Sequence, residues 1–168
     1  MKRMSWWTSV LIVILLAPAA ASAGQKQVVG WVEKAVILPE NIVLEAKVDT
    51  GADNTSLDAR DITALDRNGV KVLRFTVDTR AGRTVAIESE QVGIEIVPQH
   101  DGEDIERPLI VLEVCLGQQC RRTLVNLADR SRRKYPLLIG RSFMLDRVIV
   151  DPSREYLTEP PGRKASNP

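Results

Sequence analysis

Apolar and polar residues alternate along most of the chain from residue 25 onward, and a period of two is that of a half-buried β-strand. β-Branched residues are frequent in these stretches, while Pro, Gly, Asn and Asp gather between them. The pattern predicts strands over residues 27–38, 42–51, 70–79, 83–97, 109–115, 120–125, 136–140 and 148–157.

Helical patterns are few. Residues 140–147 (GRSFMLDR) predict a short helix directly after an apolar run, and residues 57–65 also fit one helical turn, with Asp58 as its N-cap. Many short strands with so little helix indicate an all-β fold, either a small closed barrel or a sandwich. No internal repeat or linker divides the chain, so we expect one domain.

The segment before the first strand has the features of a secretory signal peptide. Lys2 and Arg3 precede an apolar run that ends in the small residues Ala21-Ser22-Ala23. We therefore expect a signal peptide over residues 1–23 and export to a bacterial periplasm, with no membrane attachment after cleavage. The apolar run is shorter than a bilayer span, but an uncleaved anchor is the alternative.

The remainder of the chain is nearly neutral. Residues 24–157 are expected to form the domain, and the polar, Pro-rich residues 158–168 a disordered tail. The whole chain carries a net charge of +1, and loss of the two basic residues of the signal makes it −1. Nucleic acid is therefore not an expected partner. The basic run 129–136 (DRSRRKYP) is interpreted as a solvated loop in preference to a phosphate site.

Cys115 and Cys120 lie at facing ends of two alternating strands, so the segment CLGQQC predicts a β-hairpin with a four-residue turn that contains Gly117. In an exported protein such a pair favours a disulfide, and two free thiols are the alternative. A zinc site is disfavoured because His100 is the only histidine and no further ligand is placed near the pair.

Asp49-Thr50-Gly51 carries the candidate chemistry. A pair of carboxylates that share one proton can hydrolyse a peptide bond, because one activates water while the other polarises the carbonyl group. One short Asp-Thr-Gly also fits an ordinary turn after a strand. The apolar run PLLIGR (136–141), which leads into the predicted helix, is the second feature of interest.

Taken together and in this order, these segments resemble the retropepsin-like aspartic proteases. The likeness is greatest to the bacterial branch labelled "ATP-dependent zinc protease", whose members also show GWVE, AKVDTGA, RPLI, PLLIGR and VDPSREYL. It covers Val28 to Leu157. The ATP and zinc of that label have no support here, because the chain has neither a Walker phosphate loop nor an H-E-x-x-H motif. We expect no cofactor and no metal.

The resemblance implies roles for the residues of the Asp-Thr-Gly loop. Asp49 is the implied catalytic aspartate, and the hydroxyl group of Thr50 would brace two active-site loops against each other. Gly51 would let the substrate backbone approach, and Ala52 continues the loop. Since the chain has a single Asp-Thr-Gly, the resemblance implies a homodimer with Asp49 from each subunit in one site.

The resemblance also assigns the Gly-Arg strand. Asp53 would contact the substrate main chain or pair with Arg141, and Gly140 would let its strand pass beneath the catalytic loop. A flap over the substrate is expected at residues 96–107, with Gln99, His100, Asp101 and Gly102 at its tip. Residues 78–85 are the alternative flap. His100 is expected to be a solvated loop residue.

The leading hypothesis is therefore an exported homodimeric aspartic endopeptidase that acts on peptides or proteins. A second hypothesis is a periplasmic module on the same barrel that binds peptide or cell-wall ligands without cleaving them. A barrel with an incidental turn is the third, but it leaves the paired motifs unexplained.

Overall fold

The computed structural model describes residues 25–79, 82–99 and 102–160. Its elements are, in chain order, β1 (Gln27–Leu38), β2 (Ile42–Val48), β3 (Thr55–Asp58), β4 (Arg60–Arg67), β5 (Val70–Asp78), β6 (Thr84–Val97), β7 (Ile105–Leu116), β8 (Gln119–Ala128), β9 (Leu137–Ile139), α1 (Arg141–Met144) and β10 (Val148–Glu155). The residues expected to form the signal peptide, 1–23, lie outside this range. The described part of the chain contains no helix long and apolar enough to cross a membrane.

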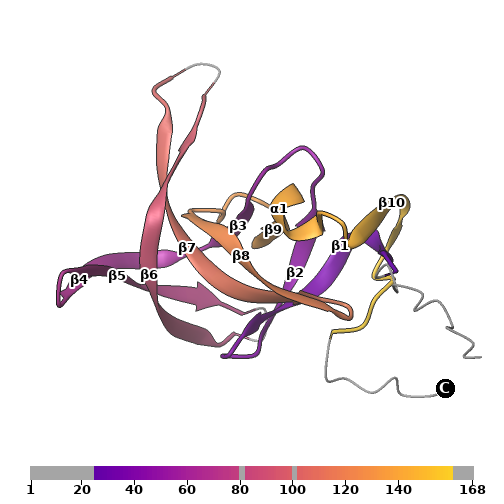
Figure 1. Cartoon of the computed structure of the whole chain (residues 1–168), viewed down its shortest axis with the longest axis horizontal. Coiled ribbons are helices and arrows are strands. Elements are labelled where there is room, and N and C mark those ends of the chain that lie inside the picture. Colours follow the sequence, from indigo (N-terminus) through magenta and orange to yellow (C-terminus); the bar gives the residue numbers. More distant parts are fainter. Residues whose placement is uncertain (1–24, 80–81, 100–101, 161–168) are drawn as a thin grey trace, which may run out of the picture.

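Six strands close into a barrel because β1 pairs on both of its edges. The order is β1, β2, β9, β3, β8 and β7, and β7 returns to β1 with Ala35 opposite Leu116. Alternate side chains of these strands fill the interior, where Ile37, Leu44 and Leu137 are fully buried. The all-β fold expected from the sequence is confirmed, and of the barrel and the sandwich it is the closed barrel that is present (Figure 1).

Two long strands carry the chain beyond the barrel. β6 pairs with β5 over its first half and with β7 from Gln91 onward, where the register shifts. The second half of β6 and the start of β7 therefore form a hairpin that projects from the barrel (Figure 1). Hairpins also connect β1 to β2 and β5 to β6.

The helical turn predicted at residues 57–65 is wrong. Thr55 to Asp58 form β3, which lies between β8 and β9, and β4 follows as the edge strand next to β5. The Asp58 carboxylate does not cap a helix, because it accepts a hydrogen bond of 2.6 Å from the Arg130 amide. Pairing on both edges of β3 outweighs the local capping signal.

The helix predicted after the Gly-Arg pair is confirmed, although it is only one turn long. Phe143 and Met144 are its buried residues, and they join the barrel core. The chain then returns as β10, which runs parallel to β1. Beyond β10, the fully buried Glu33 carboxylate accepts hydrogen bonds from the Leu157 and Thr158 amides and so holds the segment after the last strand against the barrel.

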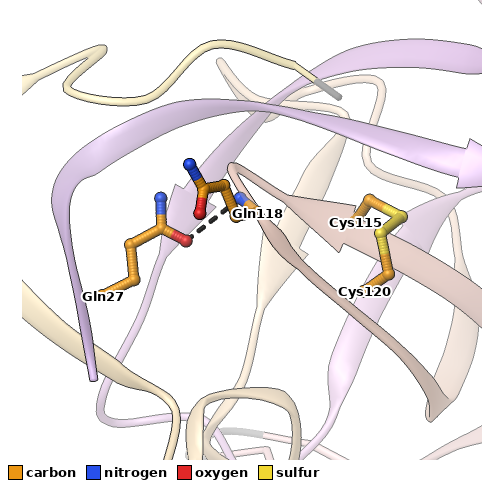
Figure 2. The surroundings of a disulfide bond; sticks show 4 residues. All are labelled: Gln27, Cys115, Gln118 and Cys120. Atoms are coloured by element: carbon orange, nitrogen blue, oxygen red, sulfur yellow. Dashed lines mark hydrogen bonds between the residues drawn. A yellow bond between two sulfur atoms is a disulfide. The ribbon is translucent and has the colours of Figure 1, made fainter. Parts of the chain in front are cut away.

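Cys115 and Cys120 are cross-strand partners on β7 and β8 and form a disulfide, so the expected bond is confirmed (Figure 2). The connection is shorter than the predicted four residues, because Leu116 and Gln119 also pair and leave two residues in the turn. Gly117 has φ = 56°, a backbone conformation that favours glycine. The Gln27 side chain accepts a hydrogen bond of 3.1 Å from the Gln118 amide and fastens the turn to β1.

Replacing both Cys115 and Cys120 by Ser should lower the free energy of unfolding by about 2 kcal/mol or less, because the closed loop is short and little chain entropy is removed from the unfolded state. Equilibrium unfolding in urea measures this change. A Gln27→Leu variant, which removes only the contact between the turn and β1, provides the comparison. Complete loss of folding in the double variant would show that the disulfide does more than shorten a local loop.

Candidate active site

Asp49 lies at the end of β2, where the chain leaves the barrel sheet in a tight turn. Its amide donates to the Ile139 carbonyl at 2.9 Å, and this bond continues the pairing of β2 with β9. The Gly51 amide donates to Asp49 Oδ1 at 3.0 Å, and the Ala52 amide donates to the Asp49 carbonyl at 3.3 Å. The turn therefore fixes the carboxylate with one oxygen toward the loop backbone.

Lys47 holds the other oxygen. Residues two apart on a strand share a face, and the Lys47 ammonium donates to Asp49 Oδ2 at 2.9 Å. This hydrogen bond lowers the pKa of Asp49 below its usual value, and partial burial of the carboxyl opposes the effect. The Gly51 amide and the charges of Lys47 and Arg130 lower the pKa further. In the isolated chain, Asp49 is thus an ionised carboxylate.

Arg141 ties the Asp-Thr-Gly loop to the chain that follows β9. Its Nη1 donates to the Thr50 carbonyl at 2.9 Å, and its Nη2 forms an ion pair with the Asp53 carboxylate, so the pairing suggested from the sequence is present. The Arg141 amide donates to the Ala52 carbonyl at 2.9 Å. The loop from Thr50 to Asp53 is therefore tied down by one arginine through both its backbone and its side chain. The bracing role of the Thr50 hydroxyl concerns a second subunit and stays a prediction.

Gly140 crosses directly under this loop. A Cβ atom at Gly140 would lie 2.4 Å from the Asn54 carbonyl oxygen and 2.8 Å from the Asp53 carbonyl oxygen, and both are backbone atoms. The Gly140 amide points to the Thr55 hydroxyl group at 3.4 Å. The strand and the loop can approach this closely only because residue 140 has no side chain.

Asp49 opens onto a cleft of about 800 Å³. One wall is the projecting hairpin, through Val97, Gln99, Ile105 and Arg107, and the other is the loop between β8 and β9. The cationic residues that line the cleft outnumber its two carboxylates, Asp49 and Asp129, and they are Lys47, Arg107, Arg130, Arg132, Arg133 and Lys134. The cleft is therefore strongly basic around the one carboxylate that the turn presents.

The loop of residues 129–136 faces this cleft as well as solvent, and sequence reasoning missed this placement. Arg130 anchors it, because its amide donates to Asp58 and its Nε donates to the Tyr135 carbonyl at 3.3 Å. Burial, with Arg107 and Arg133 nearby, lowers the pKa of Arg130 from its usual value. A run of positive charge gives no indication by itself of which other segment it faces.

One of the two candidate flap segments lines this cleft. Of the two candidate segments, residues 96–107 contribute to its lining, and the described residues of 78–85 do not. Gln99 lines the cleft, Gly102 is exposed, and His100 and Asp101 lie outside the described residues. At the base of the hairpin, Glu95 accepts hydrogen bonds from Asn54 at 3.1 Å and Asn126 at 2.5 Å. The hairpin is therefore linked to the loop that follows Asp49.

Lys47, Asn54 and Glu95 are residues of this site that the sequence did not single out. Only Lys47 had a signal, since it stands two positions before Asp49 on the same strand and therefore on the same face. Among the residues that the structure describes, no group of three or more His, Cys, Asp or Glu side chains is arranged to hold a metal ion.

The family follows from the comparison with known proteins. The model of the family described as "Retropepsin-like aspartic endopeptidase RimB" matches residues 28–161, nearly all of the described chain. The chain belongs to this RimB-like family. Membership confirms the resemblance to retropepsin-like proteases and is consistent with the closed barrel described above.

Solved and curated proteins place the RimB-like chain in a wider context. A Legionella pneumophila protein of unknown function is 40% identical, superposes with a TM-score of 0.71, and matches 80% of this chain and 100% of its own. Proteins named probable alpha-L-glutamate ligase are 31% identical in Parasynechococcus marenigrum and 28% identical in Shewanella pealeana, each over 67% of this chain. The chain spans about a quarter of the length of these curated relatives.

Proposed function

We propose that this RimB-like chain is an exported aspartic endopeptidase that works as a homodimer and prefers acidic peptides. The observation that carries the proposal is the position of Asp49, which is held in an Asp-Thr-Gly turn and lines a basic cleft. The loop around it is braced by Arg141 and lies over Gly140, which is the arrangement expected for a carboxylate that must keep a fixed direction.

The chemistry requires two carboxylates. In a dyad of two Asp49 residues, the ionised one takes a proton from water, whose oxygen adds to the peptide carbonyl carbon, while the other donates its proton to the carbonyl oxygen. The tetrahedral species then collapses: the Asp49 that gave up its proton takes one back from a hydroxyl group of this species as the C=O bond re-forms, the peptide C–N bond breaks, and the leaving nitrogen receives the proton taken from water. Each described chain contributes one Asp-Thr-Gly turn, so a two-fold dimer would complete the site.

The preference for acidic peptides is proposed from charge complementarity. Arg107, Arg132, Arg133 and Lys134 line the cleft beside Asp49 and would attract carboxylate side chains of a substrate. The curated relatives carry the name of a ligase for glutamate, a residue of this charge, and the matched region is a quarter of their length. Export is proposed from residues 1–23, which have the features of a signal peptide.

A direct test uses purified protein and pairs of peptides that differ only in Glu or Gln at each position. Sedimentation gives the mass in solution, and mass spectrometry gives the cleavage products. The proposal expects a dimer that cuts the Glu peptides faster than their Gln counterparts. A monomer that returns every peptide intact would contradict it.

Reversing charge in the basic loop tests the substrate preference. The Arg132→Glu, Arg133→Glu double variant should reduce kcat/KM for a Glu peptide roughly ten-fold and should weaken its dependence on salt, because two attractive charges become repulsive. The matched control is Arg122→Glu, Arg154→Glu, which makes the same change in net charge at exposed residues that do not line the cleft. Equal effects of the two double variants would show that the loop does not recognise the charge of the substrate.

A second candidate function is a binding module that holds acidic peptides without cutting them. The Lys47 contact favours it, because an ion-paired Asp49 is an ionised carboxylate and not a shared-proton dyad. Calorimetry would then detect acidic peptide bound to a monomer, and the peptide would be recovered intact after long incubation. An Asp49→Asn variant would bind it at least as tightly.

A further inference from the structure

We propose that Lys47 couples the charge of the substrate to the protonation of Asp49. In the free protein its ammonium holds the Asp49 carboxylate, and an anionic group of a substrate in the cleft draws the ammonium away, so that the dyad can take up its catalytic proton. This inference rests on the proposed function, since it assigns a task to a residue beside the proposed dyad.

The first observation is that Lys47 occupies the oxygen that a dyad needs. Its ammonium lies 2.9 Å from Asp49 Oδ2, while Oδ1 accepts from the Gly51 amide. The positive charge of the ammonium stabilises the ionised carboxylate, and the hydrogen bond to Oδ2 is stronger when that oxygen is ionised, so protonation of Oδ2 is disfavoured while Lys47 is bound to it. The free arrangement therefore favours two ionised carboxylates over the singly protonated pair that cleavage requires.

The second observation is that Lys47 also faces the cleft. Its side chain is 44% exposed and lines the same cavity as Asp49, so a substrate carboxylate can reach the ammonium without entering the core. The exchange replaces one carboxylate partner by another and leaves Lys47 paired throughout. A neutral peptide offers no such partner, and Lys47 then stays on Asp49.

Several other charged groups also line this part of the cleft beside Lys47 and Asp49. Arg130 adds a smaller effect on the pKa of Asp49, and Asp129 is the second carboxylate of the lining. The remaining cations of the lining come from β7 and from the loop between β8 and β9, and they are Arg107, Arg132, Arg133 and Lys134. Lys47 differs from all of these because it donates directly to Asp49.

The sign of the pH dependence follows from this contact. Lys47 lowers the pKa of Asp49, so at a given pH the dyad of the free protein holds its proton less often. The alkaline limb of the rate profile, where that proton is lost, should therefore lie at higher pH for a Glu peptide than for its Gln counterpart. In Lys47→Gln the alkaline limb for the Gln peptide should move to higher pH, so that the limbs for the two peptides coincide.

The experiment measures kcat and KM against pH for both peptides. On the alkaline limb of the wild type, Lys47→Gln should cleave the Gln peptide roughly ten times faster, while KM for the Glu peptide rises. Lys47→Arg, which keeps the charge, should retain the wild-type difference between the peptides. Lys71→Gln, a lysine on β5 outside the cleft, is the matched control. Limbs that do not move in Lys47→Gln, or a peptide difference that persists there, would overturn the inference.

A titration without turnover separates this inference from the proposed function. Carbon NMR of the Asp49 carboxyl group should show it titrating at higher pH in Lys47→Gln than in the wild type. The same upward change is expected when the wild type receives an acidic peptide with a reduced, uncleavable amide bond. If no protein cleaves any peptide, the proposed function fails, and this titration still decides whether Lys47 responds to an acidic ligand. An Asp49 titration that neither the variant nor the peptide changes would refute the coupling.

Discussion

An Asp49→Asn variant is expected to fold and assemble like the wild type and to lose peptide cleavage by at least roughly 10³-fold. The amide can still accept the Gly51 hydrogen bond, so the turn at the end of β2 should persist. It cannot take a proton from water, and a positioned acid or base contributes on the order of 10²–10⁴ to a rate. Initial rates on a Glu peptide, with circular dichroism and sedimentation on the same samples, measure both expectations.

The control for this variant is Asp66→Asn. The Asp66 carboxylate also accepts a hydrogen bond from a turn amide, that of Gly69 at 3.0 Å, but Asp66 lies near the end of β4 and does not line the cleft. The Asp66→Asn variant should therefore keep wild-type activity within a factor of about two. Full activity in Asp49→Asn, in a protein that is folded and dimeric, would remove Asp49 from the mechanism and leave the binding module as the better account.

Gly140→Ala is expected to lower the free energy of unfolding by about 3 kcal/mol and activity by roughly 10²-fold. The added Cβ atom would meet the Asn54 carbonyl oxygen at 2.4 Å, and a backbone atom cannot turn aside as a flexible side chain can. The loop that carries Asp49 would have to shift, and a displacement of about 1 Å at a reacting group can reduce a rate to this extent. Urea unfolding and initial rates measure the two effects.

Gly93→Ala is the matched control because a Cβ atom at Gly93 would meet only the Leu109 side chain, at an ordinary contact distance of 3.7 Å. Its expected effect on stability is about 1 kcal/mol or less, of either sign. The backbone of Gly140 is extended, with φ = −92° and ψ = 176°, so conformation alone does not require glycine there. If alanine is tolerated at residue 140 as well as at 93, the proposed strand and loop crossing is not tight in solution.

The alternation of apolar and polar residues predicted most of the strands. This prediction succeeded because each strand of the barrel buries one face. The resulting alternation with period two can be recognised within each strand separately. The error at residues 57–65 has the opposite cause. Asp58 next to a polar stretch fits a helix cap locally, whereas pairing of Leu57 with β8 and β9 from distant parts of the chain makes the segment a strand.

The candidate site was predictable where its residues are contiguous. The Asp-Thr-Gly turn depends on hydrogen bonds within four residues, and Gly140-Arg141 follows a recognisable apolar strand. The Arg141 pairing with Asp53 came from the family resemblance, because no spacing in the sequence relates residues so far apart.

Most of the strands, the turn after Asp49, the single Asp-Thr-Gly and the cysteine pair could be predicted from the amino-acid sequence, since each depends on neighbours along the chain. The placement of the basic loop of residues 129–136 in the same cleft as Asp49, with the projecting hairpin as a wall, follows only from the folded structure. Closure of the barrel brings β2, β7 and the β8–β9 connection together, and the electrostatics of a carboxylate depend on what is near it in space.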